Sequence, residues 1–309
     1  MSGCQSTSPM NINLHIDCDP LWVYAGEYGL QPDYADARIY EESLPALLEL
    51  LKARNLPATW FVIGRDLELP ACRDFCRQAI DAGHQIANHT YSHLKDFHSV
   101  SSEVRRREIV ECHEAILRHL HHTCRGIRLP GYYFDRSIVS VLTEMDYLYD
   151  SSVLPGPGVH LMSAAYLLFN SQERSKRFGR PWFLFSAASP YRLTHTAGGK
   201  TCWEVPLGTL PLLRLPIHST FVFQWGMHYF KSAMALNRSL RPHMVYLFHG
   251  IDLLDDRGMG PLAKKVGSLR RNVAQRRDMI TAILDAMARE TVATTEESMA
   301  RWQPMPRAV

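Results

Sequence analysis

The stretch GHQIANHTYSH, residues 83–93, joins a short apolar segment to two histidines that lie four residues apart. Residues 85–88 have the pattern of a buried strand, and we expect His89 and His93 on one turn after it. Two imidazoles placed in this way can bind one metal ion. The chain contains 15 histidines, so such a pair also arises by chance, and the surrounding sequence has to decide.

Strand-like and helix-like segments alternate on both sides of this stretch. Strands are expected at residues 12–17, 58–63, 85–88, 126–128, 147–151, 202–207, 220–223 and 243–249. Helices are expected at residues 42–54, 73–82, 101–121, 136–145, 225–236 and 269–289. Repeated alternation of this kind is typical of an α/β fold with a parallel sheet, and the number of strands suits a barrel.

The alternation predicts one barrel domain over residues 11–300, with a flexible N-terminus at residues 1–10 and a C-terminal tail at residues 301–309. Residues 155–199 are rich in Pro, Gly, Ser and aromatic residues and interrupt the pattern, so we expect an inserted loop region there. Long segments of this type are commonly lids or binding loops.

The composition is that of a globular protein with a substantial core, with 46% apolar and 21% charged residues. The net charge of +3 is too balanced to indicate a nucleic-acid partner. Basic residues cluster at residues 105–107 and 264–277. These clusters are either solvated helix faces or contacts to an anionic membrane surface or a phosphate, and the sequence leaves both open. It does not fix the oligomeric state.

The cysteines indicate a reducing compartment. There are seven, and no CxxC pair occurs, so reduced thiols are the simplest interpretation. The N-terminal residues show no basic segment followed by an apolar one, and no run approaches 18 apolar residues. We therefore expect a cytoplasmic protein, with peripheral contact at the inner membrane face left open.

Chemically functional side chains follow the expected strands one after another. In parallel α/β folds the carboxyl ends of the strands meet at one edge, where functional groups gather. The side chains at these ends are Asp17, Asp19, His89, His93, Arg128, Asp150 and His249. A random scatter of polar residues would not place one at the end of each of five strands.

Three of these side chains have the ligand types of a hydrolytic metal site. Asp19, His89 and His93 together would give two imidazoles and one carboxylate, with coordination positions left for water. Zinc suits this set best, and Co²⁺, Mn²⁺ or Ni²⁺ remain alternatives. Such an ion lowers the pKa of bound water from about 15.7 toward about 7.

The order Asp-x-Asp, His-Thr-x-x-His, Arg-x-Pro and Leu-x-His resembles the polysaccharide deacetylase family, also called NodB-homology proteins or family-four carbohydrate esterases. The resemblance covers residues 12–252. It implies a distorted (β/α) barrel of seven or eight strands and a metal-dependent hydrolase that cleaves an amide or ester.

The resemblance also implies a role for each matching residue. Asp17 corresponds to the catalytic base, and Asp19, His89 and His93 to the metal ligands. Arg128 corresponds to the arginine that holds the base, His249 to the general acid, and Asp150 to the aspartate that orients this histidine. A backbone N–H of Gly131 or Tyr132 corresponds to the oxyanion donor.

The departures from the family pattern concern the substrate. Cys18 separates two aspartates that are commonly adjacent, which is similar to a cytosolic branch with allantoinase-like and imidase-like members. Gly131 follows the Arg-Leu-Pro sequence where an aromatic residue is usual. The preferred substrate is an N-acetylated or N-formylated amino sugar, lipid-linked or part of another intracellular glycan precursor. A cyclic imide or ureide amidohydrolase and a non-catalytic glycan-binding barrel are the alternatives.

Other residues receive no role in the site. Residues 159–169 and 182–185 are apolar and lie near basic residues, so they either bind a lipid chain or cover the barrel core. His119, His121 and His122 are expected at a helix end, and His218 in a buried position. Asp252, Asp255 and Asp256 either line the site or belong to a solvated loop, and the assignment to the loop is preferred.

Overall fold

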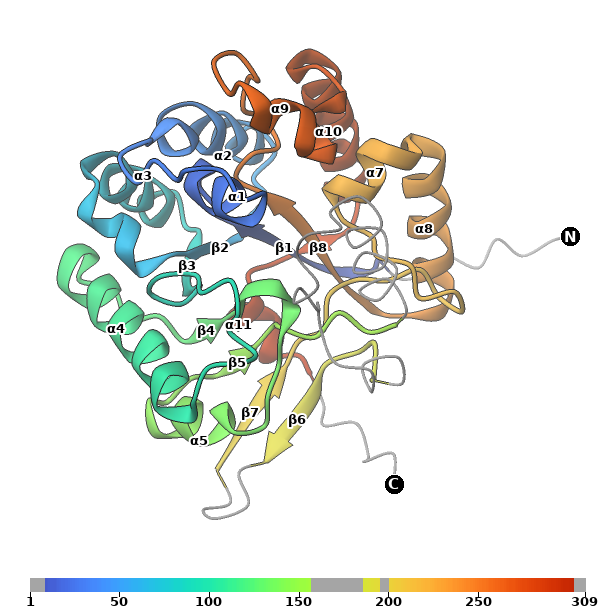
Figure 1. Cartoon of the computed structure of the whole chain (residues 1–309). Helices are drawn as coiled ribbons and strands as arrows, with labels where there is room; N and C mark the ends of the chain where they lie inside the picture. The colour runs from blue at the N-terminus through green and yellow to red at the C-terminus, as the bar shows by residue number, and fades with distance from the viewer. Residues whose placement is uncertain (1–8, 157–185, 195–199, 303–309) are drawn as a thin grey trace, which may run out of the picture.

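A curled parallel sheet forms the centre of the computed structural model, which describes residues 9–156, 186–194 and 200–302 (Figure 1). The strands are β1 (Asn11–Asp17), β2 (Thr59–Val62), β3 (Gln85–Asn88), β4 (Gly126–Ile127), β5 (Tyr149–Asp150), β6 (Tyr191–Thr194), β7 (Thr201–Glu204), β8 (His243–His249) and β9 (Thr291–Val292). Their order is β6-β7-β5-β4-β3-β2-β1-β8, with β9 beside β1. Only the β6–β7 pair is antiparallel among the described strands.

Helices surround the sheet, most of them along its outer side (Figure 1). The helices are α1 (Leu21–Glu27), α2 (Leu44–Lys52), α3 (Pro70–Asp81), α4 (Ser102–Leu120), α5 (Ile138–Glu144), α7 (Ser219–Trp225), α8 (Met227–Leu240), α9 (Pro261–Lys265), α10 (Val273–Met287) and α11 (Thr295–Met299). Among the described residues, none of these helices has the length and apolar character needed to cross a membrane.

The sheet curls until its two ends approach each other. After β7 the chain continues to Gly208, whose N–H donates to Val245 O of β8 at 2.9 Å. A parallel bridge between His218 and Leu247 adds a second contact to β8. The expected distorted (β/α) barrel of the polysaccharide deacetylase type is therefore confirmed.

Strand alternation separates an inner from an outer core. In β1, Ile12, Leu14 and Ile16 face the helices and join the main apolar core. Residues of the other parity, such as Phe61, face the barrel interior, where they form a smaller apolar cluster with Val245 and other strand residues. The barrel is thus filled by side chains, and its carboxyl end is left to carry the polar groups.

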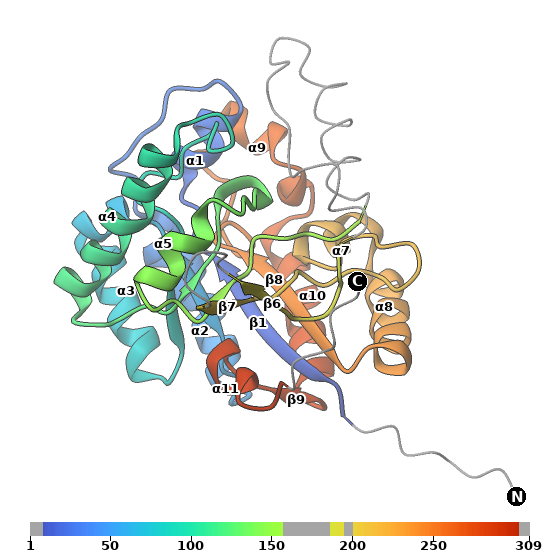
Figure 2. The same cartoon turned by 90° about the horizontal axis from the view of Figure 1, so that it is seen from below.

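The amino end of the barrel is closed by α11 (Figure 2). Asn13 of β1 donates from Nδ2 to Ala293 O at 2.8 Å and to Ser298 Oγ at 2.7 Å. Thr294 caps α11 with a reciprocal pair of hydrogen bonds to Glu297. In Figure 2, α1 and α9 lie at the opposite end, so the site has to form there.

The local structure differs from the sequence-based expectation in two places. Residues 220–223 are not a strand but part of α7, in which Ser219, Val222 and Phe223 are buried at the i, i+3, i+4 spacing of one helix face. β6 lies within the range expected to be an inserted loop, and pairs with β7. Residues 157–185 and 195–199, with the apolar and basic segments expected in the loop, lie outside the described residues.

The buried imidazole of His243 predicts an acid-sensitive fold. Its Nε2 donates to Asn13 Oδ1 at 2.6 Å, and burial lowers the pKa of His243 to about 3. The neutral ring therefore stabilises the fold above the unfolded pKa of about 6.5, and this contribution is lost as the pH falls toward 3. Between pH 6.5 and 4.5 the loss is on the order of 2–3 kcal/mol.

Urea unfolding of the wild type and of His243→Gln at pH 7 and pH 4.5 measures this effect. The glutamine keeps a hydrogen-bond donor but does not titrate, so its free energy of unfolding should fall less between the two pH values. Because both proteins contain the other histidines, the contribution of these histidines to the pH dependence cancels in the comparison. Equal losses in both proteins would show that His243 is not the titrating group.

Candidate metal centre

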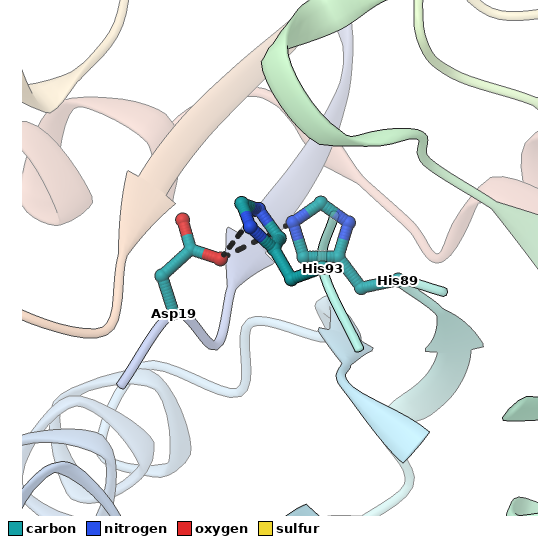
Figure 3. A group of neighbouring side chains, drawn as sticks. All are labelled: Asp19, His89 and His93. Carbon is teal, nitrogen blue, oxygen red and sulfur yellow. Dashed lines mark ion pairs between the residues drawn. The ribbon is translucent and has the colours of Figure 1, made fainter. Parts of the chain in front are cut away.

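Asp19, His89 and His93 converge on one point at the carboxyl end of the barrel (Figure 3). Asp19 Oδ1 lies 3.3 Å from His89 Nε2 and 3.5 Å from His93 Nε2. The three ligand atoms all lie within 4.8 Å of one another. They come from the loop after β1 and the loop after β3, which the sheet order separates only by β2.

The arrangement fits a divalent ion. Ligand atoms about 2.0–2.2 Å from a tetrahedral zinc ion lie about 3.3–3.6 Å from one another, which matches the two oxygen–nitrogen distances. Asp19 Oδ1 is buried, yet no described residue donates a hydrogen bond to it. A buried carboxylate oxygen without a donor is costly unless something else compensates its charge. A cation among these three ligands would do so.

A hydrogen bond orients His89 for metal binding, and burial keeps His93 neutral, although Asp17 and Asp19 raise the pKa of His89 against the effect of burial. His89 donates from Nδ1 to Arg128 O at 2.7 Å, which leaves the lone pair of Nε2 directed at Asp19 and His93. Burial lowers the pKa of His93 to about 4, against the opposing charge of Asp19. For Asp19, burial would raise the pKa, but His93 and His89 hold it below its usual value.

The four-residue spacing of His89 and His93 is that of one helical turn, but the loop that carries them is not helical. Thr90 and His93 have φ values of 64° and 46°, in the left-handed region that residues with a Cβ rarely adopt. Glu108 of α4 holds the loop in place: it accepts from Ser92 N at 2.8 Å and from Ser92 Oγ at 2.7 Å. The four-residue spacing thus works through a strained loop fixed by a buried carboxylate.

Asp17 lies beside this group and is paired with Arg128. Arg128 donates from Nη1 to Asp17 Oδ1 at 2.6 Å, and both side chains are buried. The guanidinium also donates to Ser151 O and Oγ and to His15 Nδ1. Since arginine remains protonated, His15 must accept here, and its Nε2–H is left to donate to Thr295 Oγ1 of α11 at 2.7 Å.

His249 ends β8 on the other side of the metal ligands. Its Nε2 lies 3.4 Å from the hydroxyl of Tyr132, and its Nδ1 lies 3.3 Å from Ser219 Oγ. Its backbone N–H donates to Asp252 Oδ2 at 2.9 Å. Asp252 is 1% exposed, so its assignment to a solvated loop is wrong. Burial raises the pKa of Asp252, and the nearby His249 and Ser219 oppose this shift.

Asp150, predicted to orient His249, lies on the opposite face of the sheet. The preceding Tyr149 belongs to the inner cluster, so alternation turns Asp150 outward, toward its register partner Glu204. Asp150 accepts from Ser152 Oγ at 2.6 Å. Burial raises the pKa of both carboxyls, and the neighbouring Asp150 raises the pKa of Glu204 further. The groups beside His249 are Ser219 and Asp252 instead.

A cavity of about 550 Å³ opens above these groups. Seven of the nine predicted site residues line it: Asp17, Asp19, His89, His93, Gly131, Tyr132 and His249. Arg128 lies beneath Asp17. Gly131 and Tyr132 have φ values of 64° and 56°, which turns the chain sharply at the cavity wall. The remaining walls come from α1, α7 and the α9 region, none of which was expected to contribute.

The histidines left out of the site lie where the sequence suggested. His218 is buried with its ring 5.5 Å from that of His249. His119 contacts Glu68 on the outer surface, and His121 forms the left-handed cap of α4. Glu108 and Ser219 are functional neighbours that carry no sequence signal, because each lies far along the chain from the residue it positions. Asp252 could have been found from its position three residues after His249.

Comparisons with known proteins agree with this fold. A family model described as polysaccharide deacetylase matches residues 33–149. The peptidoglycan deacetylase of Helicobacter pylori is 27% identical over 143 residues, which are 45% of this chain and 48% of that protein. The chitooligosaccharide deacetylase of Rhizobium leguminosarum bv. trifolii is 38% identical over 71 residues, 23% of this chain and 32% of that protein. The matches thus span half or less of the length of these relatives.

Solved structures extend the likeness in fold to nearly the whole chain. A Mycobacterium smegmatis protein described as a polysaccharide deacetylase superposes with a TM-score of 0.61 at 16% identity, over 100% of this chain and 96% of that one. The PuuE allantoinase superposes with a TM-score of 0.60 at 13% identity, over 96% and 91%. The fold is that of the NodB-homology barrels. Residues 33–149 are thus similar in sequence to polysaccharide deacetylases, and the likeness in fold covers nearly the whole chain.

If the three ligands hold a divalent ion, His89→Ala should lose it. Removing one of three protein ligands should weaken binding at least about 100-fold, since even the groups that orient ligands are worth about 10–100-fold. The measurement is zinc content by mass spectrometry after dialysis against a weak chelator. His228→Ala, an exposed histidine of α8, is the control and should keep its zinc. Zinc retained by His89→Ala would contradict the assignment.

Because Glu108 anchors the loop that carries His89 and His93, a change at Glu108 should also weaken zinc binding, though less than the loss of a ligand. Glu108→Gln loses the charged acceptor of the two Ser92 hydrogen bonds, and zinc affinity should fall by about 10–100-fold. Glu114→Gln on the exposed side of α4 is the matched control. Equal affinities in the two variants would show that the loop needs no such support.

Proposed function

We propose that this protein is a metal-dependent hydrolase that removes an N-acyl group, acetyl or formyl, from an amino sugar. The observation that carries the proposal is that an arginine-paired carboxylate and a histidine line the same cavity as Asp19, His89 and His93. Amide hydrolysis needs a base for water, a stabilised oxyanion and an acid for the leaving amine, and each has a candidate here.

The bound ion would act as a Lewis acid on the acyl oxygen and would raise the acidity of water. Asp17 is held by the guanidinium of Arg128 and accepts a proton from the attacking water. The water oxygen forms a bond to the acyl carbon, and a backbone N–H at Gly131 or Tyr132 donates to the oxyanion. One such donor is worth about 3–4 kcal/mol in comparable sites.

His249 completes the reaction as general acid. Its Nε2 lies at the cavity wall beside Tyr132, while Nδ1 contacts Ser219. The proton on Nε2 passes to the sugar nitrogen as the C–N bond breaks, which releases a carboxylate and an amine. Ser219 contacts the ring at Nδ1, and Asp252 holds the backbone of His249.

The choice of an amino-sugar amide is supported by the relatives. The two relatives described above are deacetylases of peptidoglycan and of chitooligosaccharide. Tyr24, Tyr28 and Phe221 line the cavity, and aromatic side chains of this kind commonly pack against sugars and other ligands with apolar faces. A lipid-linked or other intracellular glycan precursor is the substrate class within this proposal. Zinc is the preferred ion, with Co²⁺, Mn²⁺ and Ni²⁺ as alternatives.

A cytoplasmic location, free or peripheral at the inner membrane face, is also part of the proposal. It is supported by the six described cysteines, which are all unpaired and buried. Fractionation of cells into cytosol, membranes and periplasm tests it, and recovery in the periplasm would contradict it.

Release of acetate or formate from N-acylated amino sugars tests the function. The zinc-loaded wild type should release the acid, and Asp17→Asn should keep its zinc but lose about 10²–10⁴-fold in kcat, the usual worth of a general base. Asp278→Asn, an exposed aspartate of α10, should behave as the wild type. Full turnover by Asp17→Asn would rule out its role. Consumption of a cyclic imide without release of acid would identify the alternative amidohydrolase.

A further inference from the structure

One wall of the cavity is cationic. Lys264 and Lys265 of α9 line it, together with Arg270 at the end of the 3-10 helix Gly267–Arg270. All three side chains are exposed. In Figures 1 and 2 this region lies beside α1, at the same end of the barrel as the metal ligands. A basic segment that the sequence left without a role thus faces the same space as Asp19 and His249.

No ion pair neutralises this cationic wall within the described part of the chain. Lys264, Lys265 and Arg270 have no carboxylate partner within residues 9–156, 186–194 and 200–302, whereas surface arginines such as Arg54 and Arg106 do. Glu27 is the carboxylate that lines the cavity besides Asp17 and Asp19. Even if Glu27 is counted fully against the three cations, two positive charges remain.

Two arginines further along the basic segment, Arg271 and Arg276, have structural roles. Arg276 is buried and donates to Ile251 O, Asp252 O and Leu254 O, so it holds the chain after His249. Arg271 donates from Nε to Phe223 O of α7. Of the basic residues in the segment 264–277, only Lys264, Lys265 and Arg270 line the cavity.

The wall is fixed although its cations are exposed. Leu262, Val266 and Leu269 are buried between the cavity residues and pack into the main core. Lys265 Nζ lies 5.8 Å from the centre of the ring of Tyr28, the residue that follows α1. The cations therefore stand at a set position relative to the metal ligands, which is what recognition of a second group on the substrate requires.

We propose that the cationic wall binds a phosphate or phosphodiester group of the substrate, so that the amino sugar to be deacylated is one carried on phosphate. This inference rests on the proposed function of the same cavity. Two lysines and an arginine suit a phosphate, which offers several oxygens to point charges, whereas a carboxylate is best matched by a single arginine fork. A neutral glycan gives no reason for unpaired positive charge beside its binding site.

Two sources share this chemistry, a sugar nucleotide and a lipid-linked sugar phosphate. Three compounds with the same N-acetylglucosamine unit separate them: the neutral methyl glycoside, the UDP-linked sugar, and the sugar linked to a polyprenyl phosphate in neutral detergent micelles. Release of acetate gives KM and kcat for each with the zinc-loaded protein. A much lower KM for one of the two phosphate compounds identifies the source.

The test variant is Lys264→Gln/Lys265→Gln/Arg270→Gln, which removes the three charges from exposed positions. KM for the phosphate compounds should rise about tenfold with little change in kcat, because the lost contacts are several exposed charge pairs far from the reacting bond. The rise for the methyl glycoside should be several times smaller. The matched control is Lys231→Gln/Arg277→Gln/Arg289→Gln, three exposed cations outside the cavity. Its constants should equal those of the wild type.

An equal effect of the wall variant on all three compounds, or no effect on any, overturns the inference. If the wild type releases acid from none of them, the proposed function fails, and the inference is then tested by binding alone. Calorimetry with the UDP-linked sugar and the methyl glycoside should give tighter binding of the phosphate compound, and the wall variant should lose that difference. Equal binding by the wild type overturns the phosphate site without reference to activity.

Discussion

Arg128 and Asp17 form an ion pair in the interior of the barrel, with a nitrogen–oxygen distance of 2.6 Å and almost no exposed surface on either side chain. Desolvation of two charges is costly, and only good geometry with further hydrogen bonds offsets it. Here Ser151 and His15 provide them, and the guanidinium lies 4.2 Å from the centre of the Phe61 ring. Removal of one partner of such a pair commonly costs about 3–5 kcal/mol.

The same arginine connects the parts of the site. Its side chain holds Asp17, while its carbonyl accepts from His89 Nδ1 and so fixes which nitrogen faces Asp19. Through His15 it is linked to Thr295 of α11, the helix that closes the far end of the barrel. The position of the base, the tautomer of a metal ligand and the closure of the barrel therefore depend on one buried side chain. The exposed cationic wall lies at the opposite, solvent-facing end and is free to serve the substrate.

Much of the fold and of the site could be predicted from the sequence, because the position and the ends of a long regular strand can be recognised from its residues. β1 alternates polar and apolar residues, β8 is a continuous apolar run, and Asp17 and His249 stand at their last positions. The short strands carry less information. β5 has two residues, so the sequence could not tell that Tyr149 faces inward and Asp150 outward. Residues 220–223 have strand-forming side chains, but packing on the core turns them into a helix.

The contacts that hold the catalytic groups in place were beyond the reach of sequence patterns. Glu108 supports the metal-ligand loop from the middle of α4, and Ser219 meets His249 from another helix. Both contacts exist only because the barrel brings distant segments together. The strained backbone at Thr90 and His93 is likewise a consequence of tertiary structure, since nothing in HTYSH marks a left-handed residue.

The central claim is that Asp19, His89 and His93 hold one divalent ion. Anomalous diffraction at the zinc edge, from crystals of the zinc-loaded protein, tests it most directly. The claim predicts one strong peak about 2.0–2.2 Å from Asp19 Oδ1, His89 Nε2 and His93 Nε2. A peak elsewhere in the chain, or none in this cavity at full zinc loading, would contradict it.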